Sequence, residues 1–328
     1  MRSIATGRRC SLFAVFGIAF LFLFAPLPLL AWGCRGHQTI ALIAEKHLTP
    51  EAKKFVETLL LENPVDPQLN RYCGGPELGL LAAASTWSDD IRRQRPETAP
   101  WHFINIPRGA AHNPLDAYCG DRGCITKAIS DQLSILKDKN AEPPKRAEAL
   151  RFIVHFVGDL HMPLHASDNN DLGGNCVPVT YFRRDPAEHS HPFSPNLHSI
   201  WDVAILERDM EGAEPPEYAN FLDDLFGAKM ELWRKAGVHV DDWAWESHDV
   251  AESVAYGELV PKIPLESPVP TRNCSDANQI GRRMLALHIS AREAYQAAAA
   301  PIVQQRLAQA GIRLAILLND AVASAQKN

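Results

Sequence analysis

The chain contains 328 residues, of which 46% are hydrophobic and 22% are charged, and its formal net charge is −6. This length is sufficient to bury a large core within one domain. The acidic balance argues against a protein that holds nucleic acid through a broad basic surface, but it leaves open an enzyme whose positive charge is supplied by bound metal.

The first 31 residues have the layout of a secretory signal peptide. Three arginines precede an apolar run over 12–30, and the small residue Ala31 stands at the expected cleavage site. Because this leader carries no acidic residue, its removal changes the formal charge from −6 to −9. The apolar run is nearly long enough to span a bilayer, so a membrane anchor is the alternative. We predict a signal peptide over 1–31 and a secreted or periplasmic mature chain over 32–328.

The mature chain is predicted to be all-α. Apolar residues recur at the spacing of an amphipathic helix over 40–48, 52–61, 78–91, 125–136, 147–160, 198–206, 218–233, 243–259, 280–298 and 303–323. Residues 168–195 break this pattern, because they combine a Gly173-Gly174 turn, an alternating segment over 177–182 and a polar segment. No linker divides the chain. We therefore predict a single helical domain with a small loop-hairpin insertion.

Six cysteines remain after the leader is removed, and an even number in an exported chain suggests disulfides. Cys119 and Cys124 lie in a glycine-containing turn and are predicted to pair with each other. The other cysteines allow three connectivities, and they are Cys34, Cys73, Cys176 and Cys274. Zinc-thiolate ligation is the alternative, which the lack of any CxxC spacing disfavours.

The densest chemical signal consists of two His–Asp pairs. His155 and Asp159 are four residues apart and share one helix face, and His198 and Asp202 repeat that spacing. His165 lies just beyond the end of the first of these helices. A buried imidazole and carboxylate are costly to leave unpaired, and zinc binds both at about 2.0–2.2 Å. The alternative is a His–Asp hydrogen bond within a helical core, but two such pairs together with His165 favour a metal.

Weaker candidates fit the same interpretation. Asp89 and Asp90 stand where a helix is expected to end, and His102 lies in a short apolar segment. His37 follows five residues after Trp32, the first residue after the predicted cleavage site. The mature α-amino group of Trp32 would be a free nitrogen ligand. Each of these residues, taken alone, is more often a capping or core residue.

Other polar residues have structural interpretations. His161 is expected to point away from the metal candidates, because it lies between the end of a helix and a proline. Asp168 and Asp171 are able to cap the Gly173-Gly174 turn without binding anything. The polar loop also offers two candidate substrate contacts, His189 and His191.

These segments, in this order, resemble the secreted zinc nucleases called nuclease S-one and nuclease P-one, the class I nucleases. The similarity covers nearly the whole mature chain. It rests on an N-terminal Trp with a His five residues on, followed by the motifs WxD, WHF, HFxGDxHxPLH, GGN and HxxWD. The resemblance implies the all-α fold of the phospholipase C / nuclease P-one type, with a zinc cluster at the bottom of a cleft.

The resemblance also implies three zinc ions per chain, bound by nitrogen and oxygen ligands. Carried over residue by residue, the three ligand sets are Asp89, His102, His155 and Asp159 for the first ion, His165, His198 and Asp202 for the second, and Trp32, His37 and the shared Asp159 for the third. Because the third set needs the α-amino group of Trp32, it implies cleavage after Ala31.

The activity implied by the resemblance is metal-assisted hydrolysis of single-stranded DNA and RNA to 5′-phosphate products, together with cleavage of 3′-nucleotides. Asp159 would bridge two ions, and Arg92 matches a position that contacts phosphate, which suits its planar guanidinium. Phe103 would stack on a base of an unpaired strand. Asn105 departs from the Asp of fungal members, so base preference is expected to differ. No stable protein partner is implied, nor any membrane association after cleavage.

Two alternatives remain at this level. The related bacterial zinc phospholipases C share the N-terminal Trp, but they have a wider Trp-to-His spacing and a Glu in place of Asp202. A secreted helical adhesin that uses zinc only for structure is the other. Structural zinc sites are usually closed tetrahedra rich in cysteine, whereas a free N-terminus and bridging carboxylates are typical of a catalytic site.

Overall fold

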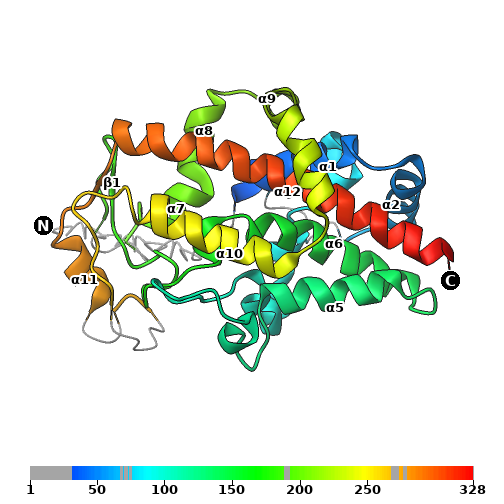
Figure 1. Cartoon of the computed structure of the whole chain (residues 1–328), viewed down its shortest axis with the longest axis horizontal. Helices are drawn as coiled ribbons and strands as arrows, with labels where there is room; N and C mark the ends of the chain where they lie inside the picture. The colour runs from blue at the N-terminus through cyan, green and yellow to red at the C-terminus, as the bar shows by residue number, and fades with distance from the viewer. Residues whose placement is uncertain are drawn as a thin grey trace, which may run out of the picture.

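The computed structural model describes residues 32–66, 69, 73, 76–187, 193–266, 273–275 and 279–327 (Figure 1). The predicted signal peptide lies outside the described residues, as do His189 and His191. The all-α prediction is confirmed. The only strands in the described part of the chain are β1 (Thr180–Tyr181) and β2 (Ser290–Ala291).

The α-helices are α1 (Gly33–Lys46), α2 (Pro50–Glu62), α3 (Leu80–Ala84), α4 (Trp87–Ile91), α5 (Ile125–Lys137), α6 (Pro143–Leu160), α7 (Leu197–Ser199), α8 (Ile205–Met210), α9 (Pro215–Ala236), α10 (Val240–Val250), α11 (Ile280–Leu285) and α12 (Glu293–Lys327). Short 3₁₀ turns among the described residues are η2 (Pro76–Leu78), η3 (Pro96–His102), η4 (Leu115–Tyr118) and η5 (Pro163–His165). Two π-helical segments are η6 (Ile200–Ala204) and η7 (Ala251–Ala255).

Helix α12 runs along most of the length of the molecule, and α1, α6, α8 and α9 pack against it (Figure 1). Its closest approach to α1 depends on Gly311, because a Cβ atom there would lie 2.5 Å from the Ile43 side chain. A glycine in mid-helix lowers intrinsic helix stability. Here that cost is offset by the packing of two apolar helix faces, which places α1 beside the centre of the core.

Helix α6 lies at the centre of the fold, and its sequence explains its limits. Two prolines occupy its first positions, where a fixed φ favours the helix and no amide donor is lost. The helix ends at Leu160, shortly before Pro163, which cannot continue it. Every residue from 149 to 160 is buried. Polar side chains on this buried part of the helix therefore face other protein groups and not water.

Four of the predicted helices are interrupted. The stretch 78–91 divides into η2, α3 and α4, where the Ser85 hydroxyl donates to the Ala82 carbonyl oxygen at 2.7 Å and competes with helix continuation. The stretches 198–206 and 243–259 contain the π-helical segments η6 and η7. The stretch 280–298 is divided by β2, because His288 adopts a left-handed conformation with φ 51°.

The predicted hairpin is reduced to isolated antiparallel bridges, between Tyr181 and Arg184 and between Pro178 and Asn196. Strand β1 pairs instead in parallel with β2, with Thr180 opposite Ser290. The partner comes from more than one hundred residues later in the chain, so the local alternation at 177–182 could not reveal it.

Three disulfides join the six cysteines. The predicted Cys119–Cys124 bond is present. The connectivity left open by the sequence is Cys34–Cys73 and Cys176–Cys274. The first ties α1 to the segment after α2, and the second ties the 168–195 insertion to the segment before α11.

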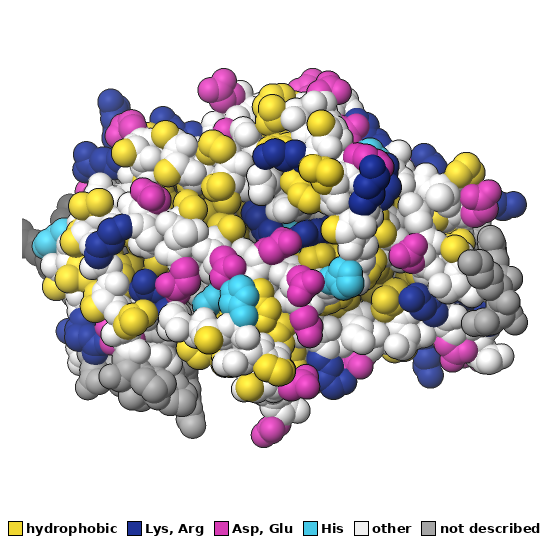
Figure 2. Space-filling view, viewed as in Figure 1, with side chains coloured by type: hydrophobic (Ala, Val, Ile, Leu, Met, Phe, Trp, Pro, Cys, Tyr) yellow, Lys and Arg dark blue, Asp and Glu magenta, His cyan; other side chains and the backbone are white. Residues whose placement is uncertain are grey.

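One face of the molecule carries mixed charge. Figure 2 shows acidic and basic side chains interspersed over this face. None of the helices in the described part of the chain combines the length and apolar character needed to cross a bilayer.

Candidate metal centre

The structure brings the predicted His and Asp ligands together in three buried groups. In each group one nitrogen or oxygen per residue lies within 4.8 Å of the others, and the groups are His37 with His155 and Asp159, Asp89 with His102 and His155, and His165 with His198 and Asp202. The first two groups share His155. The third is built from η5, α7 and η6.

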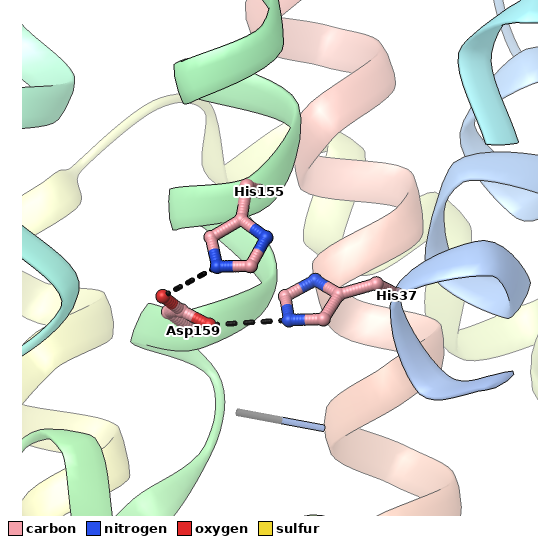
Figure 3. Close-up of side chains that lie close together, drawn as sticks. All are labelled: His37, His155 and Asp159. Carbon is pink, nitrogen blue, oxygen red and sulfur yellow. Dashed lines mark ion pairs between the residues drawn. The ribbon is translucent and has the colours of Figure 1, made fainter. Parts of the chain in front are cut away.

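The carboxylate of Asp159 lies between histidines on different elements (Figure 3). Its Oδ1 lies 3.2 Å from Nε2 of His37 on α1, and its Oδ2 lies 3.1 Å from Nε2 of His155, one turn earlier on α6. Oδ2 also lies 2.8 Å from Nδ1 of His102 at the end of η3. The two oxygens therefore face different nitrogen ligands, as a bridging carboxylate requires.

Glycine at position 158 allows this arrangement. A Cβ atom there would lie 2.8 Å from Nδ1 of His37, closer than van der Waals contact permits. Without a side chain at Gly158, the His37 ring stacks on the His155 ring with centroids 4.0 Å apart. The glycine in the HFxGDxH motif is thus explained by the close approach of α1 to α6.

Three of the ligand histidines are oriented by backbone carbonyl groups. Each donates from Nδ1 over 2.7 Å, and the bonds run from His155 to Ser85, from His165 to His102 and from His198 to Gly173. Because Nδ1 carries the hydrogen, Nε2 keeps a free lone pair for a metal ion. The sequence gave no indication of these carbonyl partners, since they depend on tertiary contacts.

Several buried atoms of the predicted ligands lack a hydrogen-bond partner. Such atoms indicate whether a metal ion fits the site. These atoms are both ring nitrogens of His37, Nε2 of His102 and one oxygen each of Asp89, Asp159 and Asp202. Leaving a buried polar atom unsatisfied costs about 1–3 kcal/mol. Cations held in the three groups would satisfy the His37 nitrogen that faces Asp159 and the unpaired oxygens of Asp89, Asp159 and Asp202. A set of imidazole and carboxylate ligands suits zinc. The residues therefore fit the metal that the family resemblance implies.

The electrostatics of the site favour neutral imidazoles together with one added positive charge. Burial lowers the pKa values of His102 and His165 to about 4, so both rings are neutral at pH 7. Burial opposes a charge on His155 as well, but Asp159 and Asp89 together raise its pKa to about 9. The two carboxylates thus favour a positive charge in the group that contains His155.

The residues predicted to contact substrate border this centre. Nη2 of Arg92 lies 3.3 Å from Oδ1 of Asp89. The segment after His102 is extended, and its side chains alternate between exposed and buried. Phe103 and Asn105 are exposed, whereas Ile104 and Ile106 are buried. The Phe103 side chain is 37% exposed, which leaves its ring accessible to a partner.

Trp32 lies against the C-terminal part of α6. Its side chain is fully buried, and its indole Nε1 donates to the Gly158 carbonyl oxygen at 2.8 Å. Its own carbonyl oxygen accepts from the Gly36 amide at 3.1 Å. The residue predicted to begin the mature chain is thus fixed next to the residue that precedes Asp159.

The residues assigned structural roles behave as expected. The His161 ring contacts α12, where Nε2 lies 3.0 Å from Nη1 of Arg313, and it takes no part in the three groups. Asp168 and Asp171 accept hydrogen bonds from the Gly173 and Gly174 amides. Asp90 belongs to none of the three groups, although burial and the neighbouring Asp89 raise its pKa to about 6.

Comparison with known proteins agrees with this geometry. The family model described as S1/P1 Nuclease matches residues 32–323. The chain belongs to the S1/P1 nuclease family. It is therefore a hydrolase that acts as an endonuclease, in a family in which zinc dependence is general. This assignment favours the nuclease over the phospholipase C and adhesin alternatives.

Individual relatives are distant but cover much of the chain. Endonuclease 2 of Arabidopsis thaliana is 29% identical over 90% of this chain and 92% of the relative. Nuclease S1 of Aspergillus oryzae is 29% identical over 64% of this chain and 69% of the relative. Nuclease P1 of Penicillium citrinum is 30% identical over 55% of this chain and 60% of the relative.

Proposed function

We propose that this protein is an exported zinc nuclease that hydrolyses single-stranded DNA and RNA to 5′-phosphate products and also cleaves 3′-nucleotides. The observation that carries the proposal is the position of Asp159, whose two carboxylate oxygens face different imidazoles, Oδ1 that of His37 and Oδ2 that of His155. A carboxylate whose two oxygens face different ligands is suited to bridge two metal ions. Structural zinc sites rarely contain a bridging carboxylate.

The proposal assigns three zinc ions to the ligand sets that the family resemblance implies, with Asp159 shared by two of them. Zinc bound here would polarise a phosphoryl oxygen and lower the pKa of an attacking water molecule. The chain's own contribution is to fix the ligands. Backbone carbonyls orient three of the imidazoles, and burial keeps His102 and His165 neutral and able to donate a lone pair.

Arg92 would bind the phosphate. Its guanidinium lies beside Asp89 at the border of the site, and 22% of its side chain is exposed. A planar guanidinium forms two parallel hydrogen bonds with phosphate oxygens. Its position beside Asp89 would hold the scissile phosphate next to the ligand cluster.

Phe103 would select unpaired strands. It follows His102 directly, and its exposed ring offers a stacking surface for one base. A base within a duplex is already stacked on its neighbours, so it has no free face for this ring. Asn105 lies on the same exposed side of the segment, where its amide could accept from and donate to a base edge.

Export is proposed on three grounds. The leader has the layout of a signal peptide, three disulfides require an oxidising compartment, and the family match begins at Trp32. Cleavage after Ala31 would also produce the free α-amino group that the third ligand set requires.

One experiment tests the proposal as a whole. The exported protein is analysed by native mass spectrometry and then assayed on single-stranded DNA, RNA, duplex DNA, a 3′-nucleotide and phosphatidylcholine. We expect a chain that begins at Trp32, three zinc ions, and cleavage of the single strands and the 3′-nucleotide that excess EDTA abolishes. One zinc per chain, or full activity in EDTA, would contradict the proposed cluster.

A further inference from the structure

A buried Tyr–Asp pair lies behind the group formed by His165, His198 and Asp202. It has no role in the function proposed above. The Tyr256 hydroxyl, directly after η7, donates to the Asp171 carboxylate, with its oxygen 3.0 and 3.1 Å from the two carboxylate oxygens. Neither side chain is more than 1% exposed. Burial and the nearby Asp168 raise the pKa of Asp171 to about 7, so this carboxyl group is costly to keep in the core.

The pair fixes the Gly173-Gly174 turn. Oδ1 of Asp171 accepts from the Gly174 amide at 2.8 Å, and Oδ1 of Asp168 accepts from the Gly173 amide at 3.1 Å. Both glycines have positive φ angles, 59° and 83°. A Cβ atom on Gly173 would lie 2.6 Å from the Leu164 carbonyl oxygen. The turn is therefore confined to one conformation, which determines where the Gly173 carbonyl points.

That carbonyl orients a proposed metal ligand. The Gly173 oxygen accepts from Nδ1 of His198 at 2.7 Å. The backbone amide of His198 in turn donates to the Gly174 oxygen at 3.3 Å. With Nδ1 held in this way, Nε2 of His198 lies 3.1 Å from Oδ2 of Asp202. An unbroken series of hydrogen bonds and covalent links thus connects the Tyr256 hydroxyl to the ligand nitrogen.

We propose that Asp171 and Tyr256 are positioning residues that hold His198 in the orientation required to bind the zinc ion shared with His165 and Asp202. The proposal rests on the zinc assignment made above. Partners of this kind set the direction and tautomer of a ligand imidazole, and their loss typically lowers metal affinity by about 10–100-fold. Only one of the three ions depends on this turn, so the effect is confined to that ion.

The test is a Tyr256→Phe variant of the mature protein, loaded with zinc and titrated with a chelator of known affinity. We expect one zinc ion per chain to be removed at a chelator concentration at least about tenfold lower than in the wild type, while the other two remain bound. Tyr218→Phe is the matched control. It removes a Tyr hydroxyl that donates to Asp209 in a part of the fold without ligands.

Substitutions of Asp171 provide a graded comparison. Asp171→Asn keeps an oxygen that accepts from the Gly174 amide, so it should retain the sensitive zinc better than Asp171→Ala. The proposal is overturned if Tyr256→Phe and Asp171→Ala bind all three ions as tightly as the wild type and only the melting temperature changes. His198→Ala tests the zinc assignment separately from the positioning roles of Asp171 and Tyr256. If this variant also keeps three ions bound, the zinc assignment itself is wrong.

Discussion

The indole Nε1 of Trp32 donates to the carbonyl oxygen of Gly158 at 2.8 Å. This bond joins the first described residue to the helix turn that carries Asp159, across 126 residues of sequence. The beginning of the family-matched segment and the centre of the ligand cluster are therefore held in one place.

The first prediction concerns Asp159. Asp159→Asn replaces one of the two carboxylate oxygens by an amide nitrogen, which cannot bind a metal ion in the same way. We expect a loss of at least one zinc ion per chain, measured by elemental analysis, and a fall in kcat/KM of more than about 100-fold. Asp131→Asn is the control, since Asp131 pairs with Lys127 at the surface. Equal zinc content and similar rates for the two variants would show that Asp159 bridges nothing.

The second prediction concerns Phe103. Phe103→Ala removes the exposed ring beside His102, so binding of a dinucleotide should weaken by about 1–3 kcal/mol, the contribution of one base stack. Zinc content should not change. Phe221→Ala is the matched control, because Phe221 is similarly exposed, at 46% against 37%, and lies on α9. An unchanged dinucleotide Kd for Phe103→Ala removes this residue from the substrate site.

Part of this site could be predicted from sequence because its signals are local. His155 and Asp159 are one helical turn apart, so their spacing alone places them on the same face. The same holds for His198 and Asp202, even though the helix between them is π-helical. Apolar periodicity also located α6, whose burial is continuous from 149 to 160.

The rest could not be predicted, because it depends on contacts between distant segments. The parallel pairing of Thr180 with Ser290 has no local pattern. The Cys176–Cys274 bond was one of several connectivities consistent with the sequence. The Tyr256 hydroxyl likewise reaches Asp171 only because η7 packs against η5.

The third prediction concerns the contact of α1 with α12. Gly311→Ala would place a methyl group 2.5 Å from the Ile43 side chain. The free energy of unfolding should fall by about 1–3 kcal/mol, as is typical of overpacked cores. Gly227→Ala is the matched control, since Gly227 also lies within a helix but has no atom within 4 Å of its would-be Cβ. There the gain in helix propensity should stabilise the protein by about 0.5–1 kcal/mol. Urea titration of both variants measures the free energy of unfolding, which should fall for Gly311→Ala and rise for Gly227→Ala.

The fourth prediction concerns acid stability. Burial opposes ionisation of Glu246, but hydrogen bonds and charge from Arg313 and Arg306 lower the pKa of this carboxyl group below 4.5. Because the folded-state pKa of Glu246 is lower than its unfolded value, the interaction of Glu246 with the two arginines stabilises the fold above about pH 4.5. The stabilisation is lost as pH falls through the folded-state pKa.

Glu246→Gln tests this dependence. The side chain is 41% exposed, and solvent screening reduces the effect to about 1 kcal/mol at pH 7. Unfolding is measured in urea between pH 3 and 7 on metal-free protein, so that zinc release does not contribute. We expect the wild type and the variant to differ at pH 7 and to converge toward pH 3. A difference that stays constant over this range would mean that Glu246 does not titrate with folding.

The last prediction concerns the N-terminus. If the mature protein carries one extra residue before Trp32, its α-amino group is replaced by an amide nitrogen, whose lone pair is delocalised into the carbonyl group. Such a nitrogen is a poor metal ligand at neutral pH. The ion assigned to Trp32, His37 and Asp159 should then bind weakly, while the ion assigned to His165, His198 and Asp202 should remain.

This extended protein should fold with an unchanged melting temperature in the metal-free state, because the indole of Trp32 still donates to Gly158. Its zinc content should fall by one ion, and its rate should fall far more than its stability. The same residue added at the C-terminus is the control, since α12 ends near α2 and α5, which carry none of the predicted ligands (Figure 1). If the N-terminally extended protein matches the exported enzyme in zinc content and in rate, Trp32 is not a ligand, and the three-zinc assignment must be revised at that position.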